Sequence, residues 1–244
     1  MQLLHPRDIK LLKTKKGRDE TGLFIIEGEK FVAEVPPEFI LQYVYSESFA
    51  KANEIAEPNI VLRDSLFATL ADTKNPQGIM AVCRQNTTQL RDLPKSGFFL
   101  LGENLNDPGN IGTLIRTAAA AGATAVILTE GSADVHNPKV LRASAGAAFR
   151  LPIVQNITLQ NAAEYLNINI YAAHPRGQIT PYQLDLSGDF CVLVGNESHG
   201  ISAAAEVLAT NLVTIPMKNA TESLNASVAG SILLYEAVRQ RMCL

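Results

Sequence analysis

Residues Phe190–Gly200 read FCVLVGNESHG, and this stretch decides the class of the fold. Five apolar residues follow one another without the polar alternation of a half-exposed strand, and the run ends in glycine, asparagine and glutamate. Continuous apolar runs are typical of parallel strands that are buried on both faces of a sheet. The stretch therefore predicts a buried parallel strand with polar groups beyond its carboxyl end.

The rest of the chain repeats this pattern and predicts two α/β domains joined near residues 85–97, a polar stretch with proline and glycine. For the larger domain, 96–244, we expect strands at 97–102, 124–129, 169–173, 190–195 and 212–216, and helices at 112–121, 138–146, 159–166, 200–209 and 224–241. For the smaller domain, 1–92, we expect strands at 22–26, 40–45, 59–63 and 78–84, and helices at 7–16, 28–35, 47–56 and 65–71. Helices packed on a sheet are the expected architecture of both domains.

Composition is that of an ordinary globular chain, with 244 residues of which 47% are hydrophobic and 18% charged. No apolar run is long enough to span a bilayer, and the N-terminus lacks the apolar core of a secretory signal. Cys83, Cys191 and Cys243 lie far apart, which favours reduced thiols over a disulfide framework. We therefore expect a cytoplasmic protein without a membrane partner.

The charge of the chain argues against a generally adhesive nucleic-acid binder, because the formal net charge is −3. Residues 7–18 nevertheless concentrate positive charge against the single acid Asp8. This segment is either a solvated helix face or an electrostatic footprint for phosphates. The candidate RNA-binding residues are Arg7, Lys10, Lys13, Lys15, Lys16 and Arg18.

Two common kinds of site are disfavoured by the sequence. The stretch LGENLNDPGNIG, residues 101–112, lacks the glycine spacing of a dinucleotide fingerprint, and the chain has no Walker loop. Its histidines, His5, His136, His174 and His199, are scattered without the spacing of a ligand set. We therefore expect no metal site.

The first candidate functional loop follows the strand at 97–102. Its sequence NDPGNIGTLIR, residues 106–116, predicts a tight turn at 107–109 with Asn110 near the N-cap of the next helix. Arg116 then lies nearly two turns along that helix. This pattern fits either a well-capped helix with a surface arginine or a functional loop.

Two more loops follow the strands at 190–195 and 212–216, where open parallel sheets bind ligands. Gly195 has no Cβ, so we expect a flat ligand to approach the backbone there, and Glu197 adds a polar group. In IPMKNATESLNAS, residues 215–227, Ser223 is the expected N-cap of the last helix. Together the two strand ends could hold an adenine-like ring by main-chain hydrogen bonds.

Three stretches of the sequence together resemble the three signature motifs of the SpoU (TrmH) family of RNA 2′-O-ribose methyltransferases, within the SPOUT superfamily. These stretches are NDPGNIGTLIR, LVGNESHGIS and IPMKNATESLNASVA. The stretch GLFIIEGEKFVAE, residues 22–34, is similar to the α/β RNA substrate-binding domain often fused to that family. The resemblance covers most of the chain and implies methyl transfer from S-adenosylmethionine, a homodimer, and a deep trefoil knot in the parallel-sheet domain.

The resemblance also implies roles for individual residues. The family's catalytic and substrate-positioning residues match Asn110, Arg116, Glu197, Ser223 and Asn225, and its cofactor pocket matches Gly195, Ile215, Met217 and Leu224. Because arginine stays protonated in proteins, we expect Arg116 to clamp a phosphate and stabilise the developing alkoxide, not to act as a base.

Several alternatives stay open at this point. By analogy with the fused domain, rRNA is favoured over tRNA as the substrate. A non-catalytic RNA-binding module of the same fold, or a nucleotide-binding enzyme of another reaction class, would share the predicted architecture. Deletion of residues 1–18 is expected to weaken binding of RNA and to leave binding of the cofactor unchanged.

Overall fold

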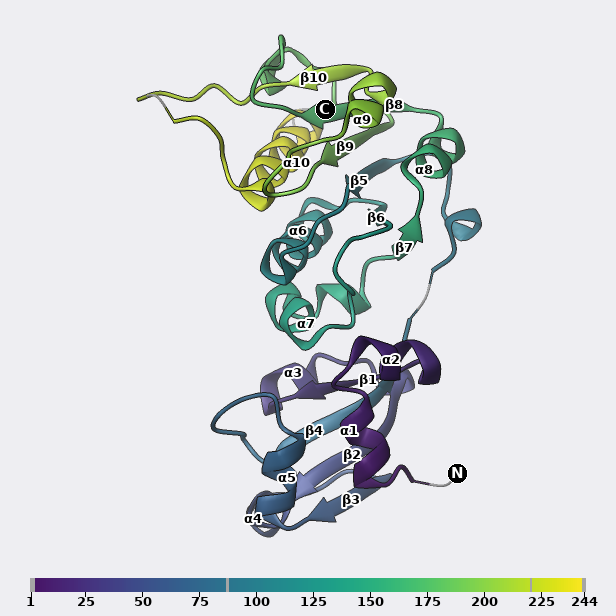
Figure 1. Cartoon of the computed structure of the whole chain (residues 1–244), viewed down its shortest axis with the longest axis vertical. Coiled ribbons are helices and arrows are strands. Elements are labelled where there is room, and N and C mark those ends of the chain that lie inside the picture. The colour runs from purple at the N-terminus through teal and green to yellow at the C-terminus, as the bar shows by residue number, and fades with distance from the viewer. Residues whose placement is uncertain (1–2, 87, 220, 243–244) are drawn as a thin grey trace.

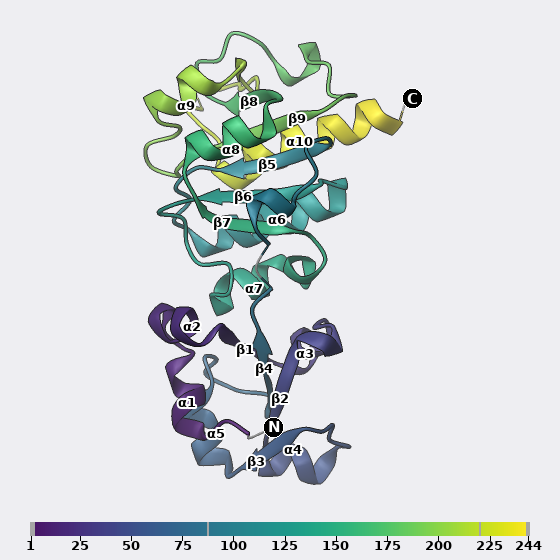
Figure 2. The same ribbon diagram turned by 90° about the vertical axis from the view of Figure 1, so that its right-hand side faces the viewer.

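The protein consists of two α/β units that lie end to end along its long axis (Figures 1 and 2). The structure is a computed structural model and describes residues 3–86, 88–219 and 221–242. One unit holds a four-stranded sheet and the other a six-stranded sheet. None of the helices among the described residues combines the length and the apolar character needed to cross a bilayer.

The N-terminal unit is a mixed sheet in the order β1-β4-β2-β3. Its strands are β1 (Leu23–Glu27), β2 (Ile40–Ser46), β3 (Asn59–Leu62) and β4 (Ile79–Arg84), and its helices are α1 (Pro6–Leu11), α2 (Lys15–Thr21), α3 (Glu29–Ala33), α4 (Glu47–Ala52) and α5 (Asp64–Leu70). Strand β4 runs antiparallel to both of its neighbours, whereas β2 and β3 are parallel. All four strands predicted for this part of the chain are present.

The C-terminal unit is a wholly parallel sheet in the order β10-β8-β9-β5-β6-β7. Its strands are β5 (Phe98–Gly102), β6 (Ala125–Thr129), β7 (Ile153–Ile157), β8 (Asn169–Ala173), β9 (Phe190–Val194) and β10 (Asn211–Val213), and its helices are α6 (Pro108–Ala121), α7 (Pro138–Ser144), α8 (Leu159–Leu166), α9 (Ala203–Leu208) and α10 (Ala226–Met242). The predicted parallel α/β class is therefore confirmed.

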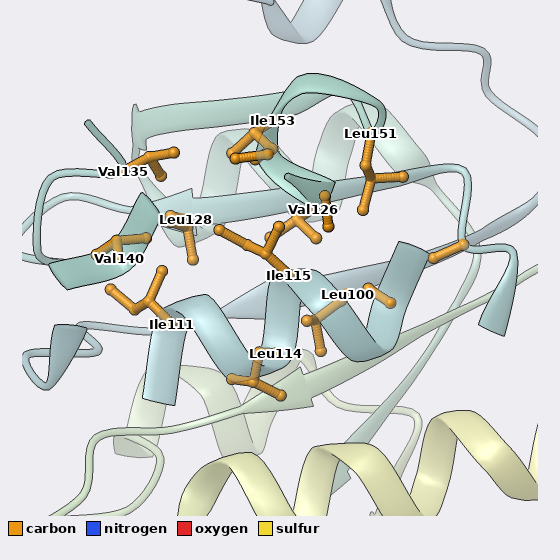
Figure 3. Close-up of a cluster of buried hydrophobic side chains, with 14 of the residues drawn as sticks. Leu100, Ile111, Leu114, Ile115, Val126, Leu128, Val135, Val140, Leu151 and Ile153 are labelled. Atoms are coloured by element: carbon orange, nitrogen blue, oxygen red, sulfur yellow. The ribbon is translucent and has the colours of Figure 1, made fainter. Parts of the chain in front are cut away.

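Burial on both faces explains the uninterrupted apolar runs of this sheet. Successive side chains of a strand point to opposite faces. In β5, Leu100 packs with α6, α7 and α10 in one core cluster, whereas Phe99 and Leu101 pack with α8 and α9 in another. Figure 3 shows the first of these faces, with Leu100 beside Ile115 of α6. Both faces are covered by helices, so every position of β5 is apolar except the terminal glycine.

Three of the differences between the expected and the observed elements have a clear local cause. Strand β7 was not predicted, because at the edge of the sheet it carries polar Gln155 and Asn156 within its five residues. The helix expected at 7–16 is two helices, since the Thr14 side chain accepts a hydrogen bond from Gly17 N (3.1 Å) and starts α2. Helix α6 begins at Pro108, and its N-cap is Asp107, not Asn110.

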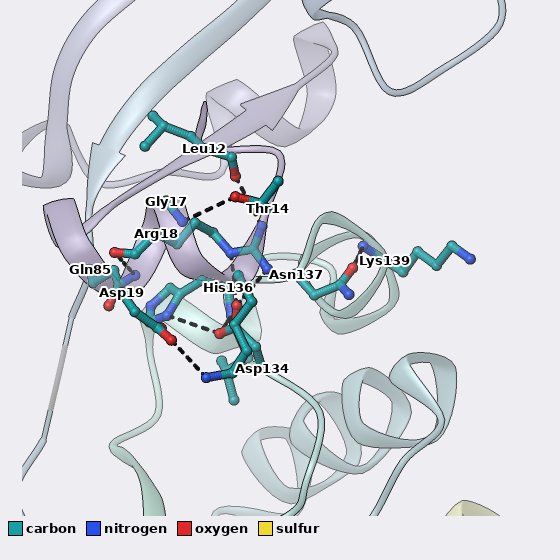
Figure 4. Close-up of polar contacts among 12 residues, drawn as sticks. Leu12, Thr14, Gly17, Arg18, Asp19, Gln85, Asp134, His136, Asn137 and Lys139 are labelled. Carbon is teal, nitrogen blue, oxygen red and sulfur yellow. Dashed lines mark hydrogen bonds and ion pairs between the residues drawn. The ribbon is translucent and has the colours of Figure 1, made fainter. Parts of the chain in front are cut away.

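A buried ion pair joins the two units at the seam between α2 and the loop before α7. Arg18 Nε lies 2.7 Å from Asp134 Oδ2, and both side chains are nearly inaccessible to solvent. The Arg18 Nη1 group donates to Leu12 O (2.9 Å), and Gln85 Nε2 donates to Arg18 O (3.1 Å). The His136 and Phe24 rings meet across the same seam, with centroids 4.9 Å apart and planes tilted by 35°. Figure 4 shows the polar contacts around Arg18, which tie the two units together.

Candidate active site

A cavity of about 340 Å³ lies where the chain leaves β8, β9 and β10 and enters α10. Its size falls at the lower end of the range of small-molecule sites. Ligands of open parallel sheets are expected beyond the carboxyl ends of strands, as here. The predicted site residues that line the cavity are Gly195, Glu197, Ile215, Met217, Ser223 and Leu224.

Glu197 ties the loop after β9 to the loop after β5. Its Oε1 accepts hydrogen bonds from Asp107 N (3.1 Å) and Asn110 Nδ2 (3.0 Å), and its Oε2 accepts one from Asn106 N (3.1 Å). Partial burial raises the pKa of Glu197, but these hydrogen bonds outweigh it, so the pKa lies below its usual value. Glu197 is therefore an ionised acceptor that holds two loops together.

The same network continues from Glu197 to the start of α10. Because a carboxylate only accepts, Asn110 must turn its amide nitrogen to Glu197, which leaves its Oδ1 to accept from Asn225 Nδ2 (2.9 Å). Asn225 then presents its own Oδ1 to Ser227 N (2.9 Å) at the first turn of α10. Three of the five residues predicted to be catalytic, Asn110, Glu197 and Asn225, are thus brought together, and Asn225 takes the capping role expected of Ser223.

The other two residues predicted to be catalytic do not join this network. Ser223 lines the cavity, but its side chain makes no hydrogen bond with the part of the chain that the structure describes. Arg116 is exposed on α6, does not line the cavity and makes no side-chain hydrogen bond with the described residues. Six residues separate it from Asn110, which is about 9 Å along a helix axis and about a third of a turn around it.

All four residues predicted to bind a cofactor line the cavity, and the structure gives a further reason for glycine at Gly195. A Cβ on Gly195 would lie 2.3–2.4 Å from the backbone of Gly200 and Ile201, so glycine is required by the tight return of the chain there. Within the described residues, the backbone groups of Ile215, Met217 and Leu224 make no hydrogen bond with protein. These backbone groups therefore remain available to a ligand.

Sequence reasoning missed part of the cavity wall. The cavity is also lined by three residues that follow β8, namely His174, Pro175 and Arg176. In the sequence, the spacing of His174 from the other histidines was used only as evidence against a metal site. Strand β8 lies between β9 and β10, so its end reaches the same place as theirs. The sequence feature that could have identified these residues is the polar stretch after the apolar run at 169–173. Without the strand order, however, the sequence does not show that this stretch lies next to the other two strand ends.

The predicted RNA-binding segment lies in the other unit, on α1 and α2. Five of its six basic residues are exposed, namely Arg7, Lys10, Lys13, Lys15 and Lys16. Arg18 is a correction: it is 3% exposed and its guanidinium is bound by Asp134 at the seam, so it cannot face RNA. Lys15 and Lys16 form surface ion pairs with Asp19 and Glu20, which solvent weakens.

Three other cavities among the described residues are lined by none of the residues predicted for catalysis or cofactor binding. A cavity of about 230 Å³ at the seam is lined by Lys13 and Arg18 but by none of the residues predicted for catalysis or cofactor binding. No group of three or more histidine, cysteine, aspartate or glutamate side chains within the described ranges is placed to hold a metal ion.

Comparison with known proteins extends over both units. The SpoU rRNA Methylase family matches residues 97–235, and the MRM3-like substrate binding domain matches residues 7–81. The chain is 33% identical over 240 residues to the 23S rRNA (guanosine(2553)-2′-O)-methyltransferase RlmP of Bacillus subtilis, with 94% of each chain covered.

Two solved structures share the whole architecture. The SpoU methyltransferase AviRb from Streptomyces viridochromogenes, in complex with the cofactor AdoMet, superposes with a TM-score of 0.86 at 26% identity, covering 99% of each chain. The AdoMet-bound rRNA methyltransferase from Sinorhizobium meliloti gives a TM-score of 0.84 at 30% identity, covering 96% of this chain and 94% of that one. The family match spans more than half of the chain, two of the motif loops line one cavity, and Glu197 ties the third loop to them, so this protein belongs to the SpoU rRNA methylase family.

Proposed function

We propose that this protein is an S-adenosylmethionine-dependent methyltransferase that modifies ribose 2′-oxygens of RNA, with rRNA as the substrate class. The single observation that carries the proposal is the Glu197–Asn110–Asn225 network, which holds three motif loops beside a cavity lined by the four predicted cofactor residues. The names of the relatives support rRNA over tRNA.

The residues of the cavity fit S-adenosylmethionine. Apolar side chains of Ile215, Met217 and Leu224 suit an adenine ring, and their unused backbone groups suit its ring nitrogens and amino group. Bound there, the cofactor would supply an electrophilic methyl group on a sulfonium, which needs no metal for transfer to an oxygen. The chain's contribution is orientation of the two reactants, which is a large source of rate in bimolecular chemistry.

Each residue of the network has a positioning role in this proposal. Glu197 stays ionised and fixes the loops after β5 and β9, and Asn110 passes that constraint to the start of α10 through Asn225. Arg116, exposed and without a protein partner among the described residues, is the candidate for holding the phosphate beside the target ribose. Ser223, on the cavity wall, is the candidate for contact with the acceptor ribose.

Transfer of a radiolabelled methyl group to purified rRNA and tRNA tests the proposal directly. Label in rRNA at a ribose 2′-oxygen, absent when the RNA is omitted, is the expected result. Label in tRNA alone would overturn the substrate class. Binding of RNA without any cofactor-dependent thermal shift or transfer would show a non-catalytic module.

We also propose a homodimer formed through α10. This helix is apolar on several sides: Leu233 and Leu234 are buried against the sheet, whereas Val228 and Tyr235 are 45% and 51% exposed. Exposed apolar side chains beside a packed helix face are candidates for contact with a second copy of the chain. Sedimentation equilibrium should give twice the chain mass for the protein and the chain mass for Tyr235→Glu; a monomeric wild-type protein at micromolar concentration would reject the dimer.

The trefoil knot, the role of the N-terminal unit and the location in the cell are further parts of the proposal. A knot is supported by the path of the chain, which leaves β9, crosses to β10 on the far side of β8 and returns to α10. RNA binding by the N-terminal unit is supported by its match to a substrate-binding domain. A crystal structure with bound RNA would test both, by the crossing of the chain near α10 and by the position of the RNA.

A cytoplasmic location is supported by the state of the cysteines. Cys83 and Cys191 are buried free thiols, and burial raises the pKa of Cys83 to about 12. Such thiols resist oxidation and need no oxidising compartment. Cys243 lies outside the described residues. Fractionation of cells that express a tagged protein tests this location, and recovery in the membrane fraction would contradict it.

A further inference from the structure

The turn after β8 places one arginine at the rim of the cavity. Gly177 N donates to His174 O (3.1 Å), which closes a four-residue turn with Pro175 and Arg176 at its corners. Proline at the second position of such a turn has its φ preset by the ring. Arg176 N also donates to His174 Nδ1 (3.1 Å), so the backbone of the arginine is held from two sides.

Contacts with β10 and its continuation fix this turn in place. His174 N donates to Val213 O (2.9 Å), and Thr214 Oγ1 donates to Pro175 O (3.1 Å). A Cβ on Gly177 would lie only 2.6 Å from Leu212 O and Thr214 N, so the turn packs closely against that segment. The base of the Arg176 side chain is therefore held next to the segment that carries Ile215.

Arg176 is also the only lysine or arginine among the described residues that line the cavity. Its side chain is exposed and makes no hydrogen bond or ion pair with the described part of the chain. The only acidic residue of the described lining, Glu197, already accepts three hydrogen bonds from the loop after β5 and the start of α6. Of nearby acids, Glu206 faces His174 instead, with Oε1 3.6 Å from His174 Nε2.

The distribution of charge indicates what the arginine binds. Apart from Arg176 and Glu197, the described lining is formed by apolar and uncharged residues and histidine, so an anionic group on a ligand has one cationic partner. S-adenosylmethionine carries one anionic group, the α-carboxylate of its methionine part. A guanidinium matches the planar geometry of a carboxylate with two parallel hydrogen bonds.

Resting on the proposed function, we propose that Arg176 binds the α-carboxylate of the cofactor. It is a binding residue for the amino-acid end of the ligand, separate from the main-chain groups at Ile215 and Leu224 that suit the adenine. Because the carboxylate is far in bonds from the methyl group, Arg176 contributes to affinity and orientation and takes no part in bond making.

Two ligands that differ at this group test the proposal on the full chain by calorimetry. S-adenosylhomocysteine keeps the carboxylate, whereas 5′-methylthioadenosine keeps the nucleoside and the sulfur but lacks the amino-acid part. We expect Arg176→Gln to raise the Kd of S-adenosylhomocysteine about tenfold, as for removal of one charged hydrogen bond, and to change the Kd of 5′-methylthioadenosine less than about twofold. Arg176→Lys should fall between, because lysine offers a point charge.

The matched control is Arg91→Gln, which removes another exposed arginine far from the cavity lining and should change neither Kd. Equal weakening of both ligands by Arg176→Gln would overturn the proposal, because the side chain would then only shape the wall. The proposal would also be overturned if Arg176→Gln bound both ligands normally but bound RNA less well, because Arg176 would then bind a phosphate of the RNA. If the wild-type chain binds neither S-adenosylmethionine nor S-adenosylhomocysteine, the proposed function itself fails.

Discussion

At the scale of the residue, Glu197 organises the site through hydrogen bonds that it accepts. Its two oxygens serve two backbone N–H groups and one side-chain amide, and replacement by glutamine would keep the shape but turn one acceptor into a donor. One of the N–H groups after β5 would then lose its partner. Glutamine at this position would therefore remove both the negative charge and one acceptor.

We predict that Glu197→Gln lowers the free energy of unfolding by about 1 kcal/mol at pH 7, less than for a buried carboxylate because the side chain is solvent-accessible. The folded-state pKa is lowered, so this stabilisation is present above the usual carboxyl pKa and is lost as pH falls through the folded value. Urea unfolding of both proteins between about pH 7 and pH 3 checks this. A difference that grows in acid would contradict the assignment.

Arg116 gives a second prediction at this scale. Lysine keeps the positive charge of arginine but lacks its planar guanidinium, so Arg116→Lys separates the contribution of the charge from that of the planar contact. We expect Arg116→Lys to lower kcat for RNA methylation about tenfold or more, since lysine cannot form the planar two-pronged interaction with a phosphate. The Kd of S-adenosylmethionine should stay unchanged, because Arg116 does not line the cavity. Full activity with an unchanged pH profile would show that the planar interaction is not needed.

At the scale of the element, α1, α2 and the turn between them expose basic side chains to solvent and also bury apolar side chains in the core of the N-terminal unit. Ile9 and Leu12 are 0% and 1% exposed, so deletion of residues 1–18 would remove core packing together with the basic face. The deletion expected to test RNA binding is therefore unsuitable, and substitution of the exposed basic residues replaces it.

We predict that the triple variant Arg7→Gln, Lys10→Gln, Lys16→Gln binds rRNA fragments more weakly, because each phosphate left without a cation keeps its counterions. The slope of log K against log salt should fall by about 0.7 for each such phosphate, while the Kd of S-adenosylmethionine stays unchanged. Arg91→Gln, Lys95→Gln, two exposed basic residues of the linker, serve as the control. An unchanged salt slope in the triple variant would show that this face does not meet RNA.

At the scale of the whole molecule, the seam decides how the two units face each other. Burial of Asp134 raises its pKa, but hydrogen bonds from His136 and Arg18 and the charge of Arg18 outweigh burial and lower the pKa to about 2. The ion pair therefore contributes stability that is fully present above the usual carboxyl pKa and is lost as pH falls through the folded-state pKa of about 2. A fixed seam would set the distance from the basic face of α1 and α2 to the cavity.

We predict that Asp134→Asn destabilises the protein by about 3 kcal/mol, because Arg18 is left buried with no counter-charge. The double variant Arg18→Met, Asp134→Leu should recover most of this stability, since no buried charge then remains. Chemical denaturation at pH 7 measures both. A double variant as unstable as Asp134→Asn would show that the hydrogen bonds of the pair, and not the unpaired charge, dominate.

The sequence by itself determined the parallel sheet, the order of most elements and the polar loops at 106–116, 195–200 and 215–225, because apolar runs, turn residues and caps are local signals. Only the tertiary structure decided which strand ends are neighbours, and with that the place of Arg176 beside Ile215. It also decided that Arg18 is buried while its basic neighbours are exposed, and that residues 153–157, with polar Gln155 and Asn156, form an edge strand. The physical reason is that strand pairing and domain contacts join residues far apart in the chain, where local periodicity carries no information.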